Sequence, residues 1–154
     1  MKERDSAADA SSAWSLGLAL GIALVLVGLM DLALLFYPPH WASLDWEFGT
    51  IGATIEGLPL LTMGLGLVAM SSAADGRTGW MRLVSIVLIL LALFVIALLV
   101  IFALDIPVAL RAVQPAGREV LKKSIIKTGG MGAVYVMVYA VLGVKTWRRI
   151  RISK

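Results

Sequence analysis

One stretch of the chain, residues 83–104, runs for 22 consecutive positions without a charged side chain, and every position except Ser85 is apolar. As an α-helix that rises about 1.5 Å per residue, the stretch would be about 33 Å long, close to the roughly 30 Å hydrocarbon core of a bilayer. A spanning strand needs only about 10 residues of alternating character, so this length favours a helix. A helix also pairs its backbone N–H and C=O groups within the segment, as lipid requires. Residues 83–104 therefore predict a membrane-spanning helix.

Three further apolar segments predict additional spans at residues 15–36, 51–70 and 128–147. The last is the shortest, but Lys145 and Trp147 can extend it by reaching to the membrane surface. The 154 residues are 60% apolar and 16% charged, whereas soluble domains are about 45–50% apolar and about 25% charged. We therefore predict an all-α fold, an integral membrane four-helix bundle that occupies residues 1–154 as a single domain.

The composition also argues against several functional classes. Cysteine is absent, which excludes disulfides, thiolate metal sites and cysteine nucleophiles. His40 is the single histidine, so a histidine-based metal site or a Ser-His-Asp arrangement is not expected. The formal charge of +4 is small, and the basic residues lie beside apolar runs, which is typical of membrane topology rather than of nucleic-acid binding. We predict no enzyme activity, no cofactor and no nucleic-acid partner.

The basic residues predict the orientation of the chain. With four spans both termini lie on one side, and that side would carry nine of the fourteen Lys and Arg residues. The first connection, residues 37–50, has none. Cytoplasmic segments carry an excess of Lys and Arg, so we predict cytoplasmic termini, in a bacterial inner (plasma) or thylakoid membrane.

The third connection, residues 105–127, departs from this pattern because it holds the other five basic residues. Its sequence REVLKKSIIK places apolar side chains on one helical face and most basic side chains opposite. This pattern predicts a short amphipathic helix on the membrane surface at residues 116–127, ended by the glycines at 129–130. The alternative is a longer fourth helix that projects beyond the bilayer. We expect six basic side chains to face lipid: Lys122, Lys123, Lys127, Arg148, Arg149 and Arg151.

Two carboxylates, Asp31 and Glu56, interrupt the first two spans near the same end. Each lies five residues from the end of its span, so in an antiparallel hairpin both lie roughly 8 Å below the membrane boundary at about 1.5 Å per residue. A charge costs about 2.5–3.5 kcal/mol at the bilayer centre and less near the interface. Two ionised carboxylates would repel each other, so we expect a shared proton, a cation or a basic partner from residues 105–127.

Pro59 predicts a break in backbone hydrogen bonding beside Glu56. Proline has no N–H for the carbonyl of Ile55, so a continuous helix would kink there; alternatively, the second helix begins near Pro59. We expect Glu56 to be structural and to accept hydrogen bonds from the backbone or from a basic side chain. Trp46 and Phe48 would dock at the level of the lipid headgroups. The candidate interaction site comprises Asp31, Trp46, Glu47, Phe48, Glu56 and Pro59.

Small residues recur at a spacing of four along the predicted spans. The pairs are Gly17 and Gly21 (with Gly28 further on), Ala53 and Gly57, and Gly129 and Ala133. Such spacing permits close helix contact. It serves contact within one bundle as well as contact between copies in a homo-oligomer, so both remain open.

The segment DLALLFYPPHWASLDWEFGTIGATIEGLPLLTMGLGL, residues 31–67, resembles the HpsJ-like family of small cyanobacterial membrane proteins. An acidic residue near a span end, a Pro-Pro turn, a Trp-Glu pair, a Gly-x-x-x-Glu segment, a proline and a Leu-Gly run carry the resemblance. The matching residues are Asp31, Pro38, Pro39, Trp46, Glu47, Gly52, Glu56, Pro59 and Gly64. That family is named for its association with polysaccharide secretion, so the resemblance implies an accessory membrane protein without implying a reaction.

Together these features favour a non-catalytic accessory, assembly or stabilising subunit of a larger membrane complex, either secretory or bioenergetic. The expected partners are membrane lipids and other integral membrane proteins. The alternative is a small oligomeric transporter or channel that uses the carboxylates of Asp31 and Glu56.

Overall fold

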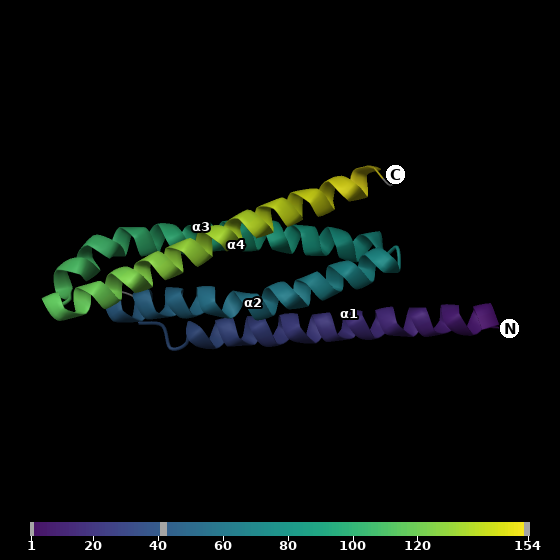
Figure 1. Cartoon of the computed structure of the whole chain (residues 1–154), viewed down its shortest axis with the longest axis horizontal. Helices are drawn as coiled ribbons and strands as arrows, with labels where there is room; N and C mark the ends of the chain where they lie inside the picture. The colour runs from purple at the N-terminus through teal and green to yellow at the C-terminus, as the bar shows by residue number, and fades with distance from the viewer. Residues whose placement is uncertain (1, 41–42, 153–154) are drawn as a thin grey trace.

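The computed structural model describes residues 2–40 and 43–152, with side chains described for residues 13–40, 43 and 46–148. Within these residues the chain forms four long α-helices and one short 3-10 helix (Figure 1). The elements are α1 (Lys2–Leu35), α2 (Leu44–Ala74), α3 (Thr78–Ala112), η1 (Pro115–Gly117) and α4 (Arg118–Ile152). Each of these four α-helices is long and apolar enough to cross a membrane, which confirms the predicted all-α membrane bundle.

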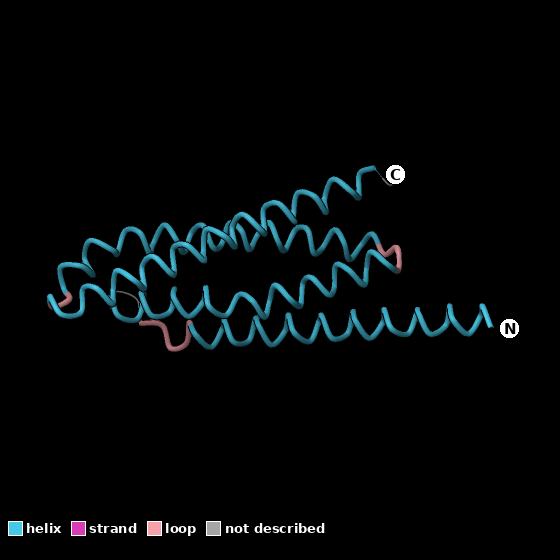
Figure 2. Tube along the Cα trace, in the orientation of Figure 1, coloured by secondary structure: helices cyan, strands magenta, loops and turns pink. Residues whose placement is uncertain are grey.

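The bundle consists of two helical hairpins. α1 packs along α2, α3 packs along α4, and the contact between α2 and α3 joins the two hairpins. α4 touches α2 more sparsely, and in the described part of the chain α1 contacts α2 alone. Both termini and the turn between α2 and α3 lie at one end, here called the termini end (Figure 2). Residues 36–40, which follow α1, and residues 113–117 lie at the other, here called the loop end.

Close backbone contact at glycines holds α1 against α2. A Cβ atom added to Gly64 would lie 2.8 Å from the backbone nitrogen of Val25 and 2.9 Å from the carbonyl oxygen of Gly21. One added to Gly28 would lie 3.3 Å from the Cβ of Leu61. Because lipid is as apolar as these side chains, close packing rather than hydrophobic burial drives such contacts. The glycine spacing of the first span therefore serves a contact within the chain.

Close contacts at glycines also hold α4 against α3, together with a buried hydrogen bond. The Ser85 hydroxyl donates to the carbonyl oxygen of Gly143 at 2.6 Å. A Cβ at Gly143 would lie 2.9 Å from Cγ1 of Ile89, and one at Gly132 would lie 2.7 Å from Cδ2 of Leu99. The single polar residue in the 83–104 stretch thus has a bonding partner on the neighbouring helix.

Tyr139 links α4 to α2 in the middle of the bundle. Its ring is fully buried in the apolar core with Leu58 and Leu61. Its hydroxyl lies 2.6 Å from Oγ1 of Thr62, which itself donates to the carbonyl of Leu58 at 2.8 Å. Thr62 has one hydroxyl hydrogen, so the Tyr139 hydroxyl donates to Thr62.

The third connection differs from the sequence prediction. α3 continues to Ala112, so the connection is short, and α4 is one helix from Arg118 to Ile152. The separate surface helix predicted at 116–127 is therefore wrong, and the alternative of a longer projecting fourth helix is correct. The glycines at 129–130 lie inside α4 because a helix that ended there would leave unpaired backbone groups at the start of the apolar stretch. At about 1.5 Å per residue, 35 residues span about 52 Å, which exceeds the roughly 30 Å hydrocarbon core.

Pro59 lies inside α2, which is helical from Leu44 to Ala74. Of the two alternatives, the start of the second helix near Pro59 is therefore wrong and the continuous helix is confirmed, so segment 46–57 is part of the helix. α2 changes direction along its length in Figure 1, as expected for a helix with an internal proline.

Candidate functional site

A polar groove lies between α2 and α4 at the loop end. We call it the loop-end groove. Its volume is about 590 Å³, and its lining combines small residues of α2 with basic and hydroxyl side chains of α4. The lining residues are Phe48, Gly49, Gly52, Ala53, Glu56, Val120, Lys123, Ser124, Lys127 and Thr128.

An ion pair crosses the loop-end groove. Nζ of Lys127 lies 2.5 Å from Oε1 of Glu56, and the two side chains are 61% and 58% exposed. Lys127 belongs to the 105–127 segment from which a basic partner was expected. The pair tethers the first third of α4 to α2, where few other contacts join these helices.

Glu56 and Lys127 lie where the uncharged stretch of α2 and of α4 begins. Residues 57–74 of α2 and 128–144 of α4 carry no charge, and these stretches of 18 and 17 residues begin directly after Glu56 and Lys127. At about 1.5 Å per residue they measure about 27 and 26 Å, close to the hydrocarbon thickness of a bilayer. Glu56 therefore stands at the border of the apolar zone rather than within it.

Asp31 lies at a similar level on α1 but outside the groove. Leu32, its neighbour, is 4.0 Å from the Cβ position of Gly57, the neighbour of Glu56, so the hairpin brings the two carboxylates to a common level. Asp31 is exposed. Among the described side chains none forms a hydrogen bond or an ion pair with its carboxylate. The two acids expected to interact therefore differ: Glu56 has a cationic partner and Asp31 has none within the described chain.

Trp46 and Phe48 contact aromatic rings outside α2, and their docking at the level of the lipid headgroups stays a prediction. The Phe48 ring lies 4.3 Å from that of Phe102, measured between centroids. Trp46 meets Phe36 edge-to-face at 6.3 Å. Both side chains are half-buried. These contacts fix the start of α2 against α3 and against the end of α1.

Glu47 meets Asp105, a contact that the sequence analysis missed. Their carboxyl groups are close enough to form a hydrogen bond, and the other oxygen of Asp105, Oδ2, is buried without a partner. Two carboxyl groups in contact need a proton or a cation between them. Within the described residues, however, no group of three or more acidic or histidine side chains is placed to hold a metal ion.

The six predicted lipid-facing basic residues occupy different surroundings. Lys122 pairs with Glu119 at 3.0 Å, whereas Lys123 and Lys127 line the loop-end groove. Arg148 lies at the termini end. The side chains of Arg149 and Arg151 lie outside the described part of the structure.

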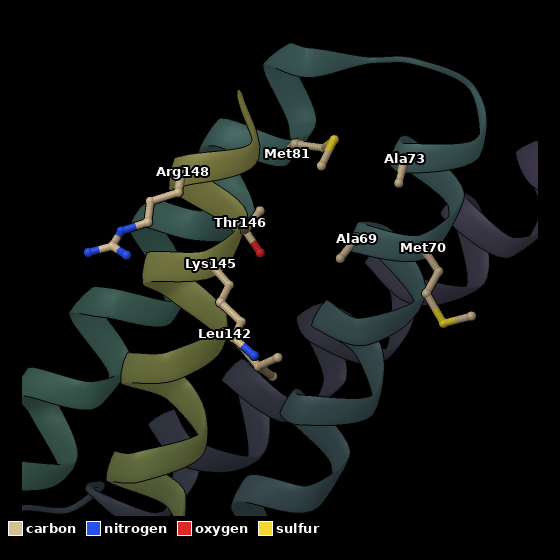
Figure 3. Close-up of a pocket in the computed structure, with 8 residues that line it drawn as sticks. All are labelled: Ala69, Met70, Ala73, Met81, Leu142, Lys145, Thr146 and Arg148. Carbon is tan, nitrogen blue, oxygen red and sulfur yellow. The ribbon is translucent and has the colours of Figure 1, made fainter. Parts of the chain in front are cut away.

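A second cleft separates α2 from α4 at the termini end (Figure 3). We call it the termini-end cleft. Its volume is about 520 Å³. It is lined by Ala69, Met70, Ala73, Met81, Leu142, Lys145, Thr146 and Arg148. Figure 3 shows Thr146 and Met81 turned toward the gap and Arg148 extending away from it.

Neither a protein-family model, a curated protein nor a solved structure matches this chain. The resemblance to the HpsJ-like family therefore stays a hypothesis, and the function must be argued from the geometry.

Proposed function

We propose that this protein is a non-catalytic accessory subunit that assembles with, or stabilises, another integral membrane protein, and that α1 provides the docking face. Secretory and bioenergetic membrane complexes are the candidate settings, the former following the HpsJ-like resemblance. The observation that carries the proposal is the position of Asp31.

Asp31 occupies the free side of α1. Its neighbours Met30 and Leu34 are 65% and 58% exposed, and within the described residues α2 is the one helix in contact with α1. A carboxylate in an apolar, outward-facing setting at the border of the uncharged zone needs water or a cation beside it. A Lys or Arg on a partner helix would supply that cation at this depth.

The contrast with Glu56 supports this assignment. Glu56 lies at a similar level of the bundle, but Lys127 of the same chain pairs with it. Asp31 lacks such a partner in the described chain, so a basic residue of a second protein would give both carboxylates a similar setting. Intramembrane ionisable residues are functional candidates when their partner is not structural.

The experiment is site-specific photocrosslinking from α1 in native membranes. A photoreactive residue at Leu34 should capture a heterologous membrane protein, and the captured band should weaken in Asp31→Asn and disappear in Asp31→Lys. Glu119→Lys, which also reverses an exposed acid but lies at the start of α4, is the matched control and should leave capture intact. Capture of lipid alone, or of a second copy of this chain alone, would contradict the accessory role.

The transporter alternative has weaker support because the Glu56 carboxylate is held by Lys127. Transport that is lost in the double variant Asp31→Asn/Glu56→Gln, with the fold retained, would favour it.

A further inference from the structure

We propose that the termini-end cleft binds one anionic phospholipid, with the Lys145 ammonium on its phosphate and one acyl chain against the apolar wall of the cleft. This site is independent of the docking face on α1, because α1 contributes no residue to the cleft lining.

The size of the cleft suits a small ligand rather than a partner helix. α2 and α4 meet at the Thr62–Tyr139 contact in the middle of the bundle, and the cleft lies beyond that contact toward the termini end. A helix 10–12 Å in diameter occupies about 420–610 Å³ per turn, so about 520 Å³ would take only about one turn of a partner helix. The volume is within the roughly 300–1,000 Å³ typical of small-ligand sites.

The chemistry of the lining is apolar on its walls and cationic at its rim. Ala69, Met81 and Leu142 provide apolar surface, and Lys145 and the Thr146 hydroxyl provide hydrogen-bond donors, whereas the Arg148 side chain extends away from the gap. The lining contains no acidic residue. Among the described side chains no carboxylate pairs with Lys145. The loop-end groove differs in this respect, because Glu56 already neutralises its Lys127.

The depth of the cleft matches the two parts of a phospholipid. Lys145 directly follows the uncharged stretch 128–144 of α4, so its backbone lies at the border of the apolar zone, the level of the lipid phosphates. Leu142 and Ala69 belong to uncharged stretches and face the acyl region. Figure 3 shows Lys145 running along α4 toward Leu142 at the edge of the gap, and the Thr146 hydroxyl facing into it. A leaflet lipid can enter sideways without leaving the bilayer.

The test is lipid retention by the full chain. The protein is reconstituted in nanodiscs of phosphatidylcholine with a minor fraction of phosphatidylglycerol, extracted in mild detergent and weighed by native mass spectrometry. We expect one retained phosphatidylglycerol. Lys145→Gln should reduce its retention about fivefold, the effect of one basic side chain near a membrane surface. Ala69→Phe should reduce retention by a similar factor because its ring fills the cleft while the charge stays.

Two comparisons separate this site from general attraction. Arg118→Gln removes the same charge at the loop end, outside the lining of either cleft, and should leave retention unchanged. Thermal melting with and without added phosphatidylglycerol checks that each variant is folded. The added lipid should raise the melting midpoint of the wild-type chain but not that of Lys145→Gln. Equal retention of phosphatidylcholine, or an equal loss in all three variants, would overturn the proposal. An unchanged Lys145→Gln would do so as well.

Discussion

The ammonium of Lys127 lies 2.5 Å from the carboxylate of Glu56, so the carboxylate next to the proline of α2 is anchored by the first part of α4. Because both groups are more than half exposed, the pair is of the type that contributes about 0–1 kcal/mol in water. Glu56→Gln keeps the shape and a hydrogen-bond acceptor, so it should lower the stability by about 1 kcal/mol or less. Glu56→Leu removes the acceptor and should lower folded yield further. Unfolding in detergent measures the stability of both variants. If Glu56→Gln abolished function while fold and assembly stayed intact, the negative charge of Glu56 would itself be required for function.

The glycine contact between α1 and α2 gives a sharper stability prediction. Gly64→Ala places a Cβ within 3 Å of two backbone atoms of α1. Backbone cannot yield as a side chain end can, so we expect a loss of about 1–3 kcal/mol. Gly66→Ala is the matched control, because nothing lies within 4 Å of its Cβ position. It should be neutral or stabilising by about 0.5–1 kcal/mol through helix propensity. Equal unfolding midpoints for the two variants would count against the close contact.

The Tyr139 hydroxyl supplies a polar link between α4 and α2. Tyr139→Phe keeps the buried ring but removes the donor to Thr62. Hydrogen bonds between membrane helices average about 0.6 kcal/mol and reach about 1.7 kcal/mol, so the loss should fall in that range. Tyr37→Phe, at a side chain that is 77% exposed, should have no effect. The free energies of unfolding in detergent decide between these outcomes.

The Glu47–Asp105 contact should tolerate removal of one charge. Asp105→Asn can donate its amide hydrogen to the Glu47 carboxylate, so no shared proton is needed. We expect its stability at neutral pH to equal or exceed that of the unvaried chain, whereas Asp105→Ala removes the hydrogen-bonding groups facing Glu47 and should be less stable. A thermal melt that ranks Asp105→Asn below Asp105→Ala would contradict a hydrogen bond from the amide to Glu47.

The topology is testable by labelling. Cysteines introduced at Ser43 and Ser153 should lie on opposite sides of the membrane, so in intact cells a membrane-impermeant maleimide should react at position 43 and not at position 153. This follows from four spans and from the basic residues at the termini end. Labelling of both positions from the same side would refute the four-span arrangement.

The four spans could be predicted from the sequence because a helix that crosses a bilayer needs an uncharged stretch about as long as the hydrocarbon core is thick. It also placed the basic partner of Glu56 in the correct segment, since Lys127 lies in residues 105–127. The course of residues 116–127 was less accessible. An amphipathic helix on the surface and the projecting end of a long helix have the same 3.6-residue periodicity, so the pattern could not choose between them.

Contacts that depend on helix register were not predictable. Glu47 meets Asp105 because α2 and α3 pack with one particular axial offset, and residue spacing does not determine this offset. The aromatic rings of Trp46 and Phe48 suit a headgroup region as well as a helix interface, so their type left the choice open. Asp31 and Glu56 lie at a common level, as the hairpin geometry predicted. The sequence could not predict that Glu56 alone has a basic partner, because this depends on where α4 lies.

The two-hairpin arrangement has a consequence for how the chain is made. The tightest contacts lie within 2–74 and within 78–152, and the turn at residues 75–77 joins them. During synthesis the first hairpin can therefore close as soon as α2 leaves the ribosome, before either later helix exists. The two halves expressed as separate polypeptides, divided at Gly76, should still meet in the membrane and re-form the α2–α3 contact. Co-purification of a tag on one half with the other half would reveal a protein whose covalent continuity is dispensable for its shape.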